Sequence, residues 1–102
     1  MNKNPGVYIL QSTKNHRYYV GSTNNIERRF EEHQRGKVRA TKYLTPVELK
    51  IFFPVNTLKA ARQIEFRIKK LKSKNTIEKI IKDKKIIIAN DYLDFTCLNS
   101  GG

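Results

Sequence analysis

Two short runs of β-forming residues lie close together near the N-terminus, and their spacing limits the folds open to the chain. Residues 6–11 follow a proline and read Gly-Val-Tyr-Ile-Leu-Gln, and a second run covers residues 17–21. Only the polar segment 12–16 separates them, so we predict an antiparallel hairpin. The connection is longer than a two-residue turn and therefore leaves the register of the pairing open.

A helix is predicted directly after the hairpin. Asn24 and Glu27 match a capping box, in which both side chains bond to free backbone amides, and Gly36 marks the end of the helix. Ile26 and Phe30 are four residues apart, so they share a face that should dock on the sheet.

A third strand and two more helices are predicted further along the chain. The strand covers residues 47–53. The next helix should begin at Asn56 or Thr57 and end near Leu71, because apolar residues recur along it at helical spacing. A last helix should begin at Asn75, where a second capping-box pattern stands.

The length of 102 residues fits one domain with a modest core. We place this domain in residues 1–85 and expect residues 86–102 to form a C-terminal extension, partly docked or disordered. Cys97 is the only cysteine, which excludes an intramolecular disulfide. No apolar run is long enough for a signal sequence or a membrane span, so we expect a soluble, cytoplasmic protein. Its oligomeric state stays open.

The chain carries 21 Lys and Arg against 9 Asp and Glu, which gives a net charge of +12. This excess favours a polyanionic partner, with nucleic acid ahead of an acidic membrane, although a solvated lysine-rich surface is the alternative. The polar segment 36–46 should be a surface loop. The residues expected to contact a nucleic-acid backbone are Arg28, Lys37, Arg39, Lys42 and Tyr43.

Tyr8 and Tyr19 lie in the two runs of the hairpin. Alternate side chains of a strand point to the same face, so both tyrosines can share one face while their neighbours face the core. Both could equally be ordinary strand aromatics, since tyrosine favours strands. Gly6 and Gly21 should leave backbone room for the approach of a ligand, which favours a functional interpretation.

Arg29 and His33 lie one turn apart on the first predicted helix. Arg29 could offer two parallel N–H donors to a phosphate, and Arg28 lies about 100° around the helix, so only one of the two arginines can face a given site. His33 could bind the same phosphate or move a proton. A lone exposed histidine is, however, at least as often structural.

Glu65 lies at the edge of the apolar stripe of the second predicted helix. A carboxylate in such a position costs free energy unless it is paired or bound to a cation. It could form a salt bridge with Arg62 or Arg67, or it could be a ligand for Mg²⁺, which takes one or two carboxylates and keeps several waters. Periodicity alone does not separate these alternatives.

At these residues the sequence resembles the GIY-YIG nuclease family, in the order and spacing of the motifs as well as in residue types. The resemblance covers roughly residues 5–84. The matching residues are Gly6-Val7-Tyr8, Tyr19-Val20-Gly21, Arg29, His33 and Glu65.

The resemblance implies an α/β (α+β) fold with a three-stranded antiparallel sheet flanked by about three helices. It also implies hydrolysis of DNA phosphodiester bonds with a divalent metal, Mg²⁺ or Mn²⁺, held by Glu65. Tyr8, its pKa lowered by metal and arginine charge, would help remove the proton of the attacking water, and Tyr19 would position the water or the phosphate. Arg29 would stabilise the transition state with help from His33. Which tyrosine is the base stays open.

Family members often carry a further polar residue after the glutamate helix, and Asn75 is a candidate for it. Larger members have additional domains that select a target, for which this chain has no room, so its sequence specificity should be low unless a protein partner supplies it. The alternative function is a non-catalytic nucleic-acid-binding module with the same fold, although such a module would not need Glu65, since a carboxylate repels phosphate. A structural basic protein associated with RNA ranks last.

Overall fold

The computed structural model describes residues 4–86. Three strands, β1 (Gly6–Ser12), β2 (Tyr18–Thr23) and β3 (Val47–Pro54), form one antiparallel sheet in the order β2–β1–β3. The central strand is buried on both faces over most of its length. The predicted hairpin and the predicted three-stranded sheet are therefore confirmed.

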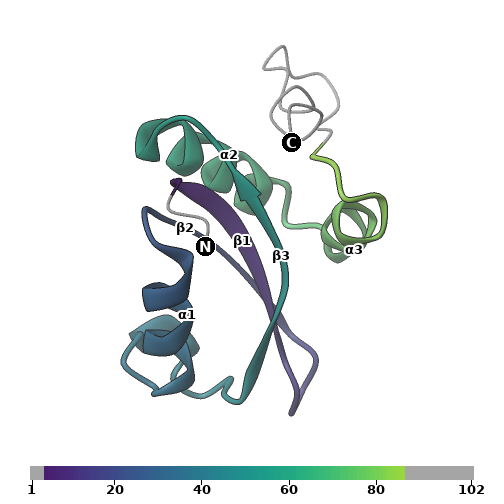
Figure 1. The fold of residues 1–102 in the computed structure, drawn as a ribbon. Helices are drawn as coiled ribbons and strands as arrows, with labels where there is room; N and C mark the ends of the chain where they lie inside the picture. Colours follow the sequence, from purple (N-terminus) through teal and green to yellow (C-terminus); the bar gives the residue numbers. More distant parts are fainter. Residues whose placement is uncertain (1–3, 87–102) are drawn as a thin grey trace.

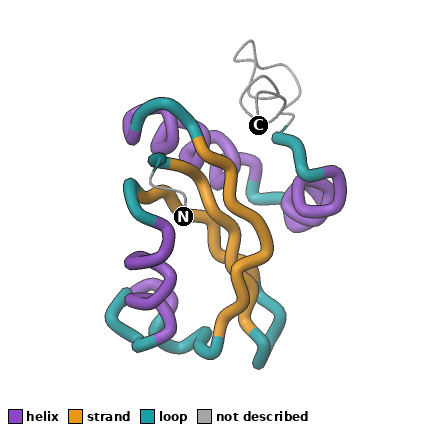
Figure 2. Tube along the Cα trace, in the orientation of Figure 1, coloured by secondary structure: helices purple, strands orange, loops and turns teal. Residues whose placement is uncertain are grey.

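Within residues 4–86 the α-helices are α1 (Ile26–Gln34), α2 (Leu58–Leu71) and α3 (Lys74–Asp83). Figure 1 shows α1 on one side of the sheet and α2 with α3 on the other, and Figure 2 shows the same layers by type of structure. Among the residues that the structure describes, no helix has the length and apolar character needed to cross a bilayer.

Each face of the sheet carries its own core. Val7, Ile9 and Val20 face α2 and α3, where they pack with Ile64 and Ile68. The alternate residues of the hairpin face α1, as strand geometry requires. The core on that side contains Tyr8, Leu10, Ile26 and Val47, with Tyr19 and Phe30 packed against it. The predictions that both tyrosines share one face of the hairpin and that Ile26 and Phe30 dock on the sheet are confirmed.

A β-bulge in β3 adjusts which residues of this strand face each core. Ile9 pairs with Ile51 but Leu10 pairs with Leu49, so Lys50 is an extra residue between the two pairs. Because of this insertion, Val47 packs on the α1 side although Ile51 packs on the α2 side. The alternation of apolar residues in 47–53 did not predict this shift.

Two of the predicted helix caps are wrong by one or two positions. Asn25, not Asn24, caps α1, since its side chain accepts a hydrogen bond from the Arg28 amide at 3.1 Å. Ser73, not Asn75, caps α3 by accepting from the Thr76 amide at 3.1 Å. All these residues are good caps by type, so sequence preference alone could not choose among neighbours. Of the two caps predicted for α2, Asn56 or Thr57, the structure has Thr57.

The segment 36–46 differs from the predicted surface loop. It contains a short 3₁₀-helix, η1 (Arg39–Thr41), and both Val38 and Thr41 are buried. Further along, Ile86, the first residue of the predicted extension, is buried in the α2-side core. The rest of that extension, including Cys97, lies outside the described residues.

The two motif glycines make room for aromatic side chains and not for a ligand. Gly21 pairs with Tyr8 across the sheet, and a Cβ at Gly21 would lie 2.4 Å from the Tyr8 Cζ and hydroxyl oxygen. A Cβ at Gly6 would meet the Phe53 carbonyl at 2.3 Å and the Phe52 ring at 2.5 Å. The expected open approach for a ligand at these glycines is therefore wrong.

We expect Gly21→Ala to destabilise the protein by about 1–3 kcal/mol, because the added methyl group would overpack against the Tyr8 ring. Gly36→Ala is a useful comparison, since its penalty comes from a φ of 73° and its Cβ would meet no atom closer than 4.0 Å. Urea unfolding of both variants measures the difference. Equal stability of Gly21→Ala and the wild type would contradict the packing argument.

Candidate active site

A buried chain of hydrogen bonds crosses from the sheet to η1. The Tyr8 hydroxyl lies 2.7 Å from His33 Nε2, and His33 Nδ1 lies 2.6 Å from Thr41 Oγ1. Tyr8 is 1% exposed, and His33 and Thr41 are each 0% exposed. His33 is thus not the solvent-facing residue considered from the sequence, since both of its ring nitrogens are held inside the protein.

His33 is neutral at physiological pH. Burial and the nearby Arg29 charge lower its pKa from 6.5 to about 4, and Glu32 opposes this effect only in part. A neutral imidazole has one N–H donor and one acceptor nitrogen. In the buried chain, therefore, one of the two neighbouring hydroxyls accepts a hydrogen bond from His33 and the other donates one to it.

Arg29 lies near the Tyr8 hydroxyl, where its charge and its N–H groups favour the ionised phenol and so lower the pKa of Tyr8. Its guanidinium also pairs with Glu32, with Nη1 3.0 Å from Oε1. Burial outweighs the effect of the arginine and raises the pKa of Tyr8 to about 12. The predicted lowering of this pKa required metal and arginine charge together, and the arginine alone does not outweigh the burial of Tyr8.

Tyr19 closes this cluster toward the surface. Its ring centroid lies 6.3 Å from that of Tyr8 and 5.2 Å from that of His33, in a tilted and an edge-on arrangement respectively. Tyr19 is only partly buried. It therefore stands between the buried hydrogen bonds and the solvent.

Glu65 reaches the same region from α2. Its Oε1 accepts a hydrogen bond from Ser22 of β2 at 2.5 Å, and its Oε2 lies 2.6 Å from Lys69 Nζ. The ammonium group of Lys69 lies 5.2 Å from the centroid of the Tyr19 ring. Glu65 also contributes to the electrostatic field at Tyr8. The Glu65 carboxylate and the side chains of Tyr8 and Tyr19 thus lie near one another at β2, which is an edge strand of the sheet.

The ion pair of Glu65 differs from the one considered from the sequence. The structure pairs Glu65 with Lys69, four residues later on α2, and not with Arg62 or Arg67. The Glu65 side chain is 20% exposed, so it can still be reached from solvent. A cation binding to Oε2 would have to compete with the Lys69 ammonium group.

A shallow cleft of about 270 Å³ opens beside these groups, between the start of α1 and α2. Arg28, Arg29 and Arg62 line it together with Ser22 and neighbouring polar atoms. The prediction that only one of the two consecutive arginines can face a given site is therefore wrong, because both long side chains reach this cleft. Three guanidinium groups around one cleft can bind phosphate oxygens through several N–H donors at once. The cleft is therefore lined both by Ser22, which donates a hydrogen bond to Glu65, and by Arg29, which lies near Tyr8.

The residues present fit a metal with few protein ligands. Within residues 4–86, no group of three or more His, Cys, Asp and Glu side chains is placed to hold a metal ion. The cluster offers two accessible carboxylates: Glu65, with the Ser22 hydroxyl beside it, and Glu32, which pairs with Arg29. Mg²⁺ accepts such a sparse set of oxygen ligands, because it keeps several waters and also binds substrate phosphates.

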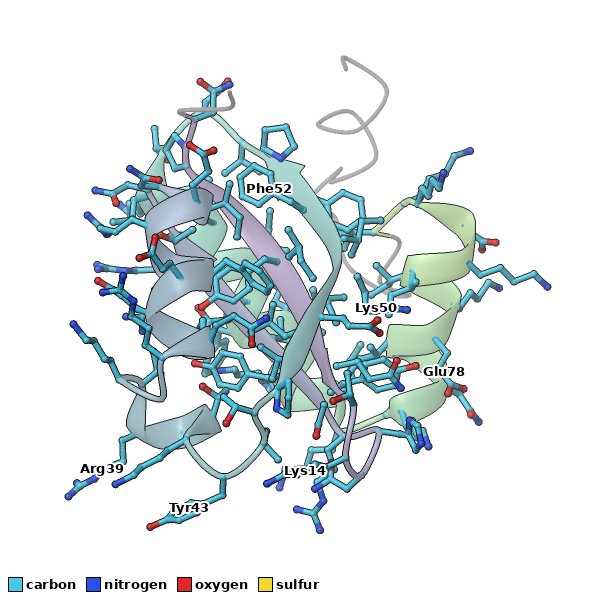
Figure 3. All side chains as sticks on the ribbon, turned by 60° about the horizontal axis from the view of Figure 1, so that its bottom comes forward. Lys14, Arg39, Tyr43, Lys50, Phe52 and Glu78 are labelled. Carbon is cyan, nitrogen blue, oxygen red and sulfur yellow. The ribbon has the colours of Figure 1, made fainter. Side chains whose placement is uncertain are left out.

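The other predicted site residues lie outside this cluster, apart from Arg28. Arg28 lines the cleft and donates to the Asn24 side chain at 3.1 Å. Figure 3 shows Arg39 and Tyr43 pointing outward beyond the end of α1, where Tyr43 is 80% exposed. Lys37 and Lys42 are also exposed in this segment. Asn75 is exposed in the first turn of α3, away from the contacts of Glu65.

Sequence reasoning missed Thr41, Ser22 and Lys69. Thr41 gave no signal, because it lies in a polar segment whose burial only the tertiary structure reveals. Lys69 could have been found, since a lysine four residues after a glutamate on a helix is a common ion pair. Ser22 could also have been found, because it shares a strand face with Val20 and therefore points toward α2.

A model of the family described as the GIY-YIG catalytic domain matches residues 4–79 of the chain. The UPF0213 protein VPA1222 of Vibrio parahaemolyticus is 35% identical over 86 residues, which cover 83% of this chain and 79% of the relative. The UPF0213 protein BLi00048/BL00536 of Bacillus licheniformis is also 35% identical, covering 83% and 88% of the two chains. The UPF0213 protein plu4503 of Photorhabdus laumondii is 33% identical, covering 91% and 88%. No solved structure matches significantly.

The lowered pKa of His33 predicts how the free energy of unfolding depends on pH. Below pH 6.5 the unfolded chain protonates His33, whereas the folded protein does not until about pH 4. The unfolded state therefore binds more protons in this window, and the free energy of unfolding falls as the pH falls through it. The loss should reach up to about 3 kcal/mol, since one pKa unit corresponds to about 1.4 kcal/mol.

Urea unfolding at several pH values between 4.5 and 7.5 tests this prediction. His33→Gln should show a shallower dependence on pH than the wild type, whatever its absolute stability. His16 lies exposed in the hairpin loop, so His16→Gln should keep the wild-type dependence. If the free energy of unfolding of His33→Gln changes with pH as steeply as that of the wild type, His33 does not titrate as described.

Proposed function

Because the chain belongs to the GIY-YIG family, whose domain is a nuclease-type catalytic domain, we propose that it is a divalent-metal-dependent endonuclease that hydrolyses DNA phosphodiester bonds. Its own preference for particular sequences is low. The observation that carries the proposal is the meeting of Tyr8, His33 and Arg29 with Glu65 beside one arginine-lined cleft.

Tyr8 and His33 are placed to move a proton together. Arg29 can only donate, so a hydrogen bond from Arg29 to the Tyr8 oxygen would use a lone pair of that oxygen and leave the Tyr8 proton for His33 Nε2. His33 then carries its own proton on Nδ1 and donates it to Thr41 Oγ1. In this arrangement the Tyr8 oxygen accepts the proton of the attacking water while its original proton passes to His33.

The relay avoids a separate ionisation of Tyr8. At pH 7, ionising a tyrosine with a pKa of about 12 costs about 7 kcal/mol. In the relay Tyr8 gives up its proton only as it accepts one from the water, so Tyr8 is neutral before and after the step. Protonating a histidine with a pKa of about 4 costs about 4 kcal/mol at the same pH, so His33 holds the transferred proton only briefly and then releases it.

The remaining residues bind and orient the phosphate. Arg29 donates to phosphate oxygens as negative charge grows on them, and Glu32 holds its guanidinium in position. Arg28 and Arg62 line the same cleft and bind the neighbouring backbone. Glu65, with Ser22 beside it, would hold the divalent ion, which supplies Lewis-acid polarisation of the phosphate when bound. Tyr19 covers the buried pair and limits the entry of solvent.

Replacement of Glu65 tests the function directly. We expect the wild type to cut DNA with Mg²⁺ or Mn²⁺ and not with EDTA, and Glu65→Gln to lose cleavage by about 100-fold or more. Glu48→Gln is the matched control, since Glu48 is an exposed carboxylate of β3. Its activity should equal that of the wild type. Circular dichroism shows whether each variant is folded.

If the folded wild type binds DNA but no divalent ion supports cleavage, the protein is a binding module with this fold. If Glu65→Gln cleaves DNA at the wild-type rate, Glu65 does not take part in the reaction.

Tyr8→Phe tests the proton relay. Removal of the hydroxyl should lower the single-turnover cleavage rate by about 10²–10⁴-fold, the usual contribution of a general acid–base group. DNA affinity measured in EDTA should change little, because the ring and Arg29 remain. A cleavage rate unchanged in Tyr8→Phe would exclude the relay.

A further inference from the structure

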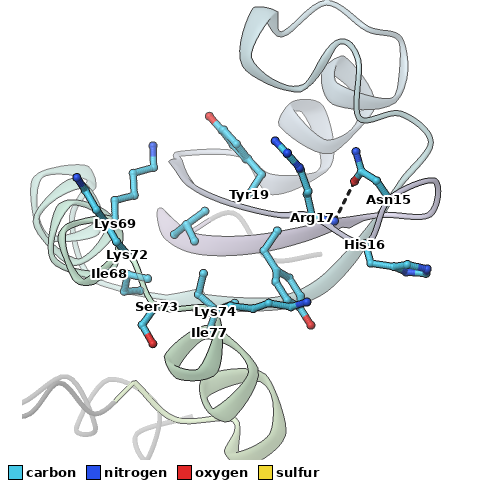
Figure 4. Close-up of a pocket in the computed structure, with 12 residues that line it drawn as sticks. Asn15, His16, Arg17, Tyr19, Ile68, Lys69, Lys72, Ser73, Lys74 and Ile77 are labelled. Atoms are coloured by element: carbon cyan, nitrogen blue, oxygen red, sulfur yellow. Dashed lines mark hydrogen bonds between the residues drawn. The ribbon is translucent and has the colours of Figure 1, made fainter.

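A second hollow lies along β2, on the side away from α1. This groove of about 400 Å³ runs between the hairpin loop with β2 on one side and the junction of α2 and α3 on the other. Figure 4 shows Lys69, Lys72 and Lys74 along one wall and Arg17 on the wall opposite. None of these residues belongs to the arginine-lined cleft of the candidate active site.

The groove combines a cationic rim with an apolar floor. Its floor includes Val20, Ile68 and Ile77, and the tyrosines of β2 add aromatic surface. None of the described residues that line it is acidic. The nearby carboxylates are Glu78, which contacts the Tyr18 hydroxyl, and Glu65, which pairs with Lys69. Such a surface fits a ligand that presents both an anion and a flat apolar face.

Tyr19 and Lys69 connect the groove to the candidate active site. Both residues line the groove. Lys69 also pairs with Glu65, and the Tyr19 ring contacts both Tyr8 and His33. A strand whose phosphate lies in the arginine-lined cleft can therefore continue past Tyr19 into the groove without crossing the body of the protein.

We propose that this groove binds a nucleotide next to the cut, with its base unpaired. Its phosphate lies against Lys72, Lys74 and Arg17, and its base lies on the apolar floor beside Tyr18. A paired duplex buries its base faces by stacking and offers phosphates to a protein, so it would use the rim and leave the floor empty. A single-stranded segment offers both groups. This inference rests on the proposed function and names the form of its substrate.

Binding in EDTA tests the groove without requiring cleavage. The probes are a fluorescein-labelled single strand, a blunt duplex of the same sequence and a single strand with abasic positions, followed by fluorescence anisotropy over a range of salt concentrations. The groove variant is Lys72→Gln/Lys74→Gln. The matched control is Lys79→Gln/Lys82→Gln, which removes two exposed lysines from α3 outside the groove.

We expect the groove variant to bind the single strand about tenfold more weakly, with a salt slope reduced by about 1.4, since each lost contact to a single strand changes the slope by about 0.7. Its affinity for the duplex should change less. The control variant should stay within about twofold of the wild type on both probes. The wild type should bind the abasic strand more weakly than the normal strand.

Other outcomes overturn the inference. Equal losses in the groove and control variants would show a diffuse charge effect, and an equal loss on the duplex would assign the groove to duplex backbone. Tight binding of the abasic strand would exclude contact with a base. If the wild type cuts DNA while any of these results holds, only the groove assignment fails. If the wild type binds neither the single strand nor the duplex, the proposed function itself fails.

Discussion

The hydrogen bond of 2.7 Å between Tyr8 and His33 is the interaction on which the rest of the structure depends. It joins the central strand to α1 inside the smaller of the two cores, where an unpaired hydroxyl or imidazole would be costly. Thr41 satisfies the second ring nitrogen and so fixes η1 against α1. One side chain thereby connects three elements that are separate in sequence, and the same connection keeps a proton donor and acceptor in contact.

The edge of the sheet at β2 explains how residues from both layers reach one site. Tyr19 and Gly21 point toward α1, whereas Val20 and Ser22 point toward α2. A central strand would separate these two sets of side chains by the thickness of the sheet. At the edge, Lys69 and Glu65 of α2 can reach past β2 to the tyrosines of the other face.

Most of the fold could be predicted from the sequence, because its helices and strands show regular apolar spacing. The order of elements and the shared face of Tyr8 and Tyr19 followed from alternation and from helical periodicity alone. The bulge at Lys50 could not be predicted, since it depends on pairing between β1 and β3. The burial of Thr41 was equally hidden, because a polar segment gives no sign that another element covers it.

The sequence predicted which residues lie at the candidate site better than it predicted their chemistry. Residue types and spacing bring Arg29 and His33 to one helix and Glu65 to another. The direction of the pKa of Tyr8 could not be predicted, because it depends on the balance between burial and one arginine. The function of the motif glycine Gly21 was likewise misread, since the space that it leaves is filled by a ring from the neighbouring strand.

The bulge in β3 has a consequence for how molecules of this protein meet. β3 is the other edge of the sheet, and its middle carries the extra residue Lys50 together with the exposed Glu48, whose side chains lie 3.8 Å apart. An irregular, charged edge is a poor template for a strand from another molecule. Edge-to-edge pairing of β3 between two copies of the protein is therefore disfavoured.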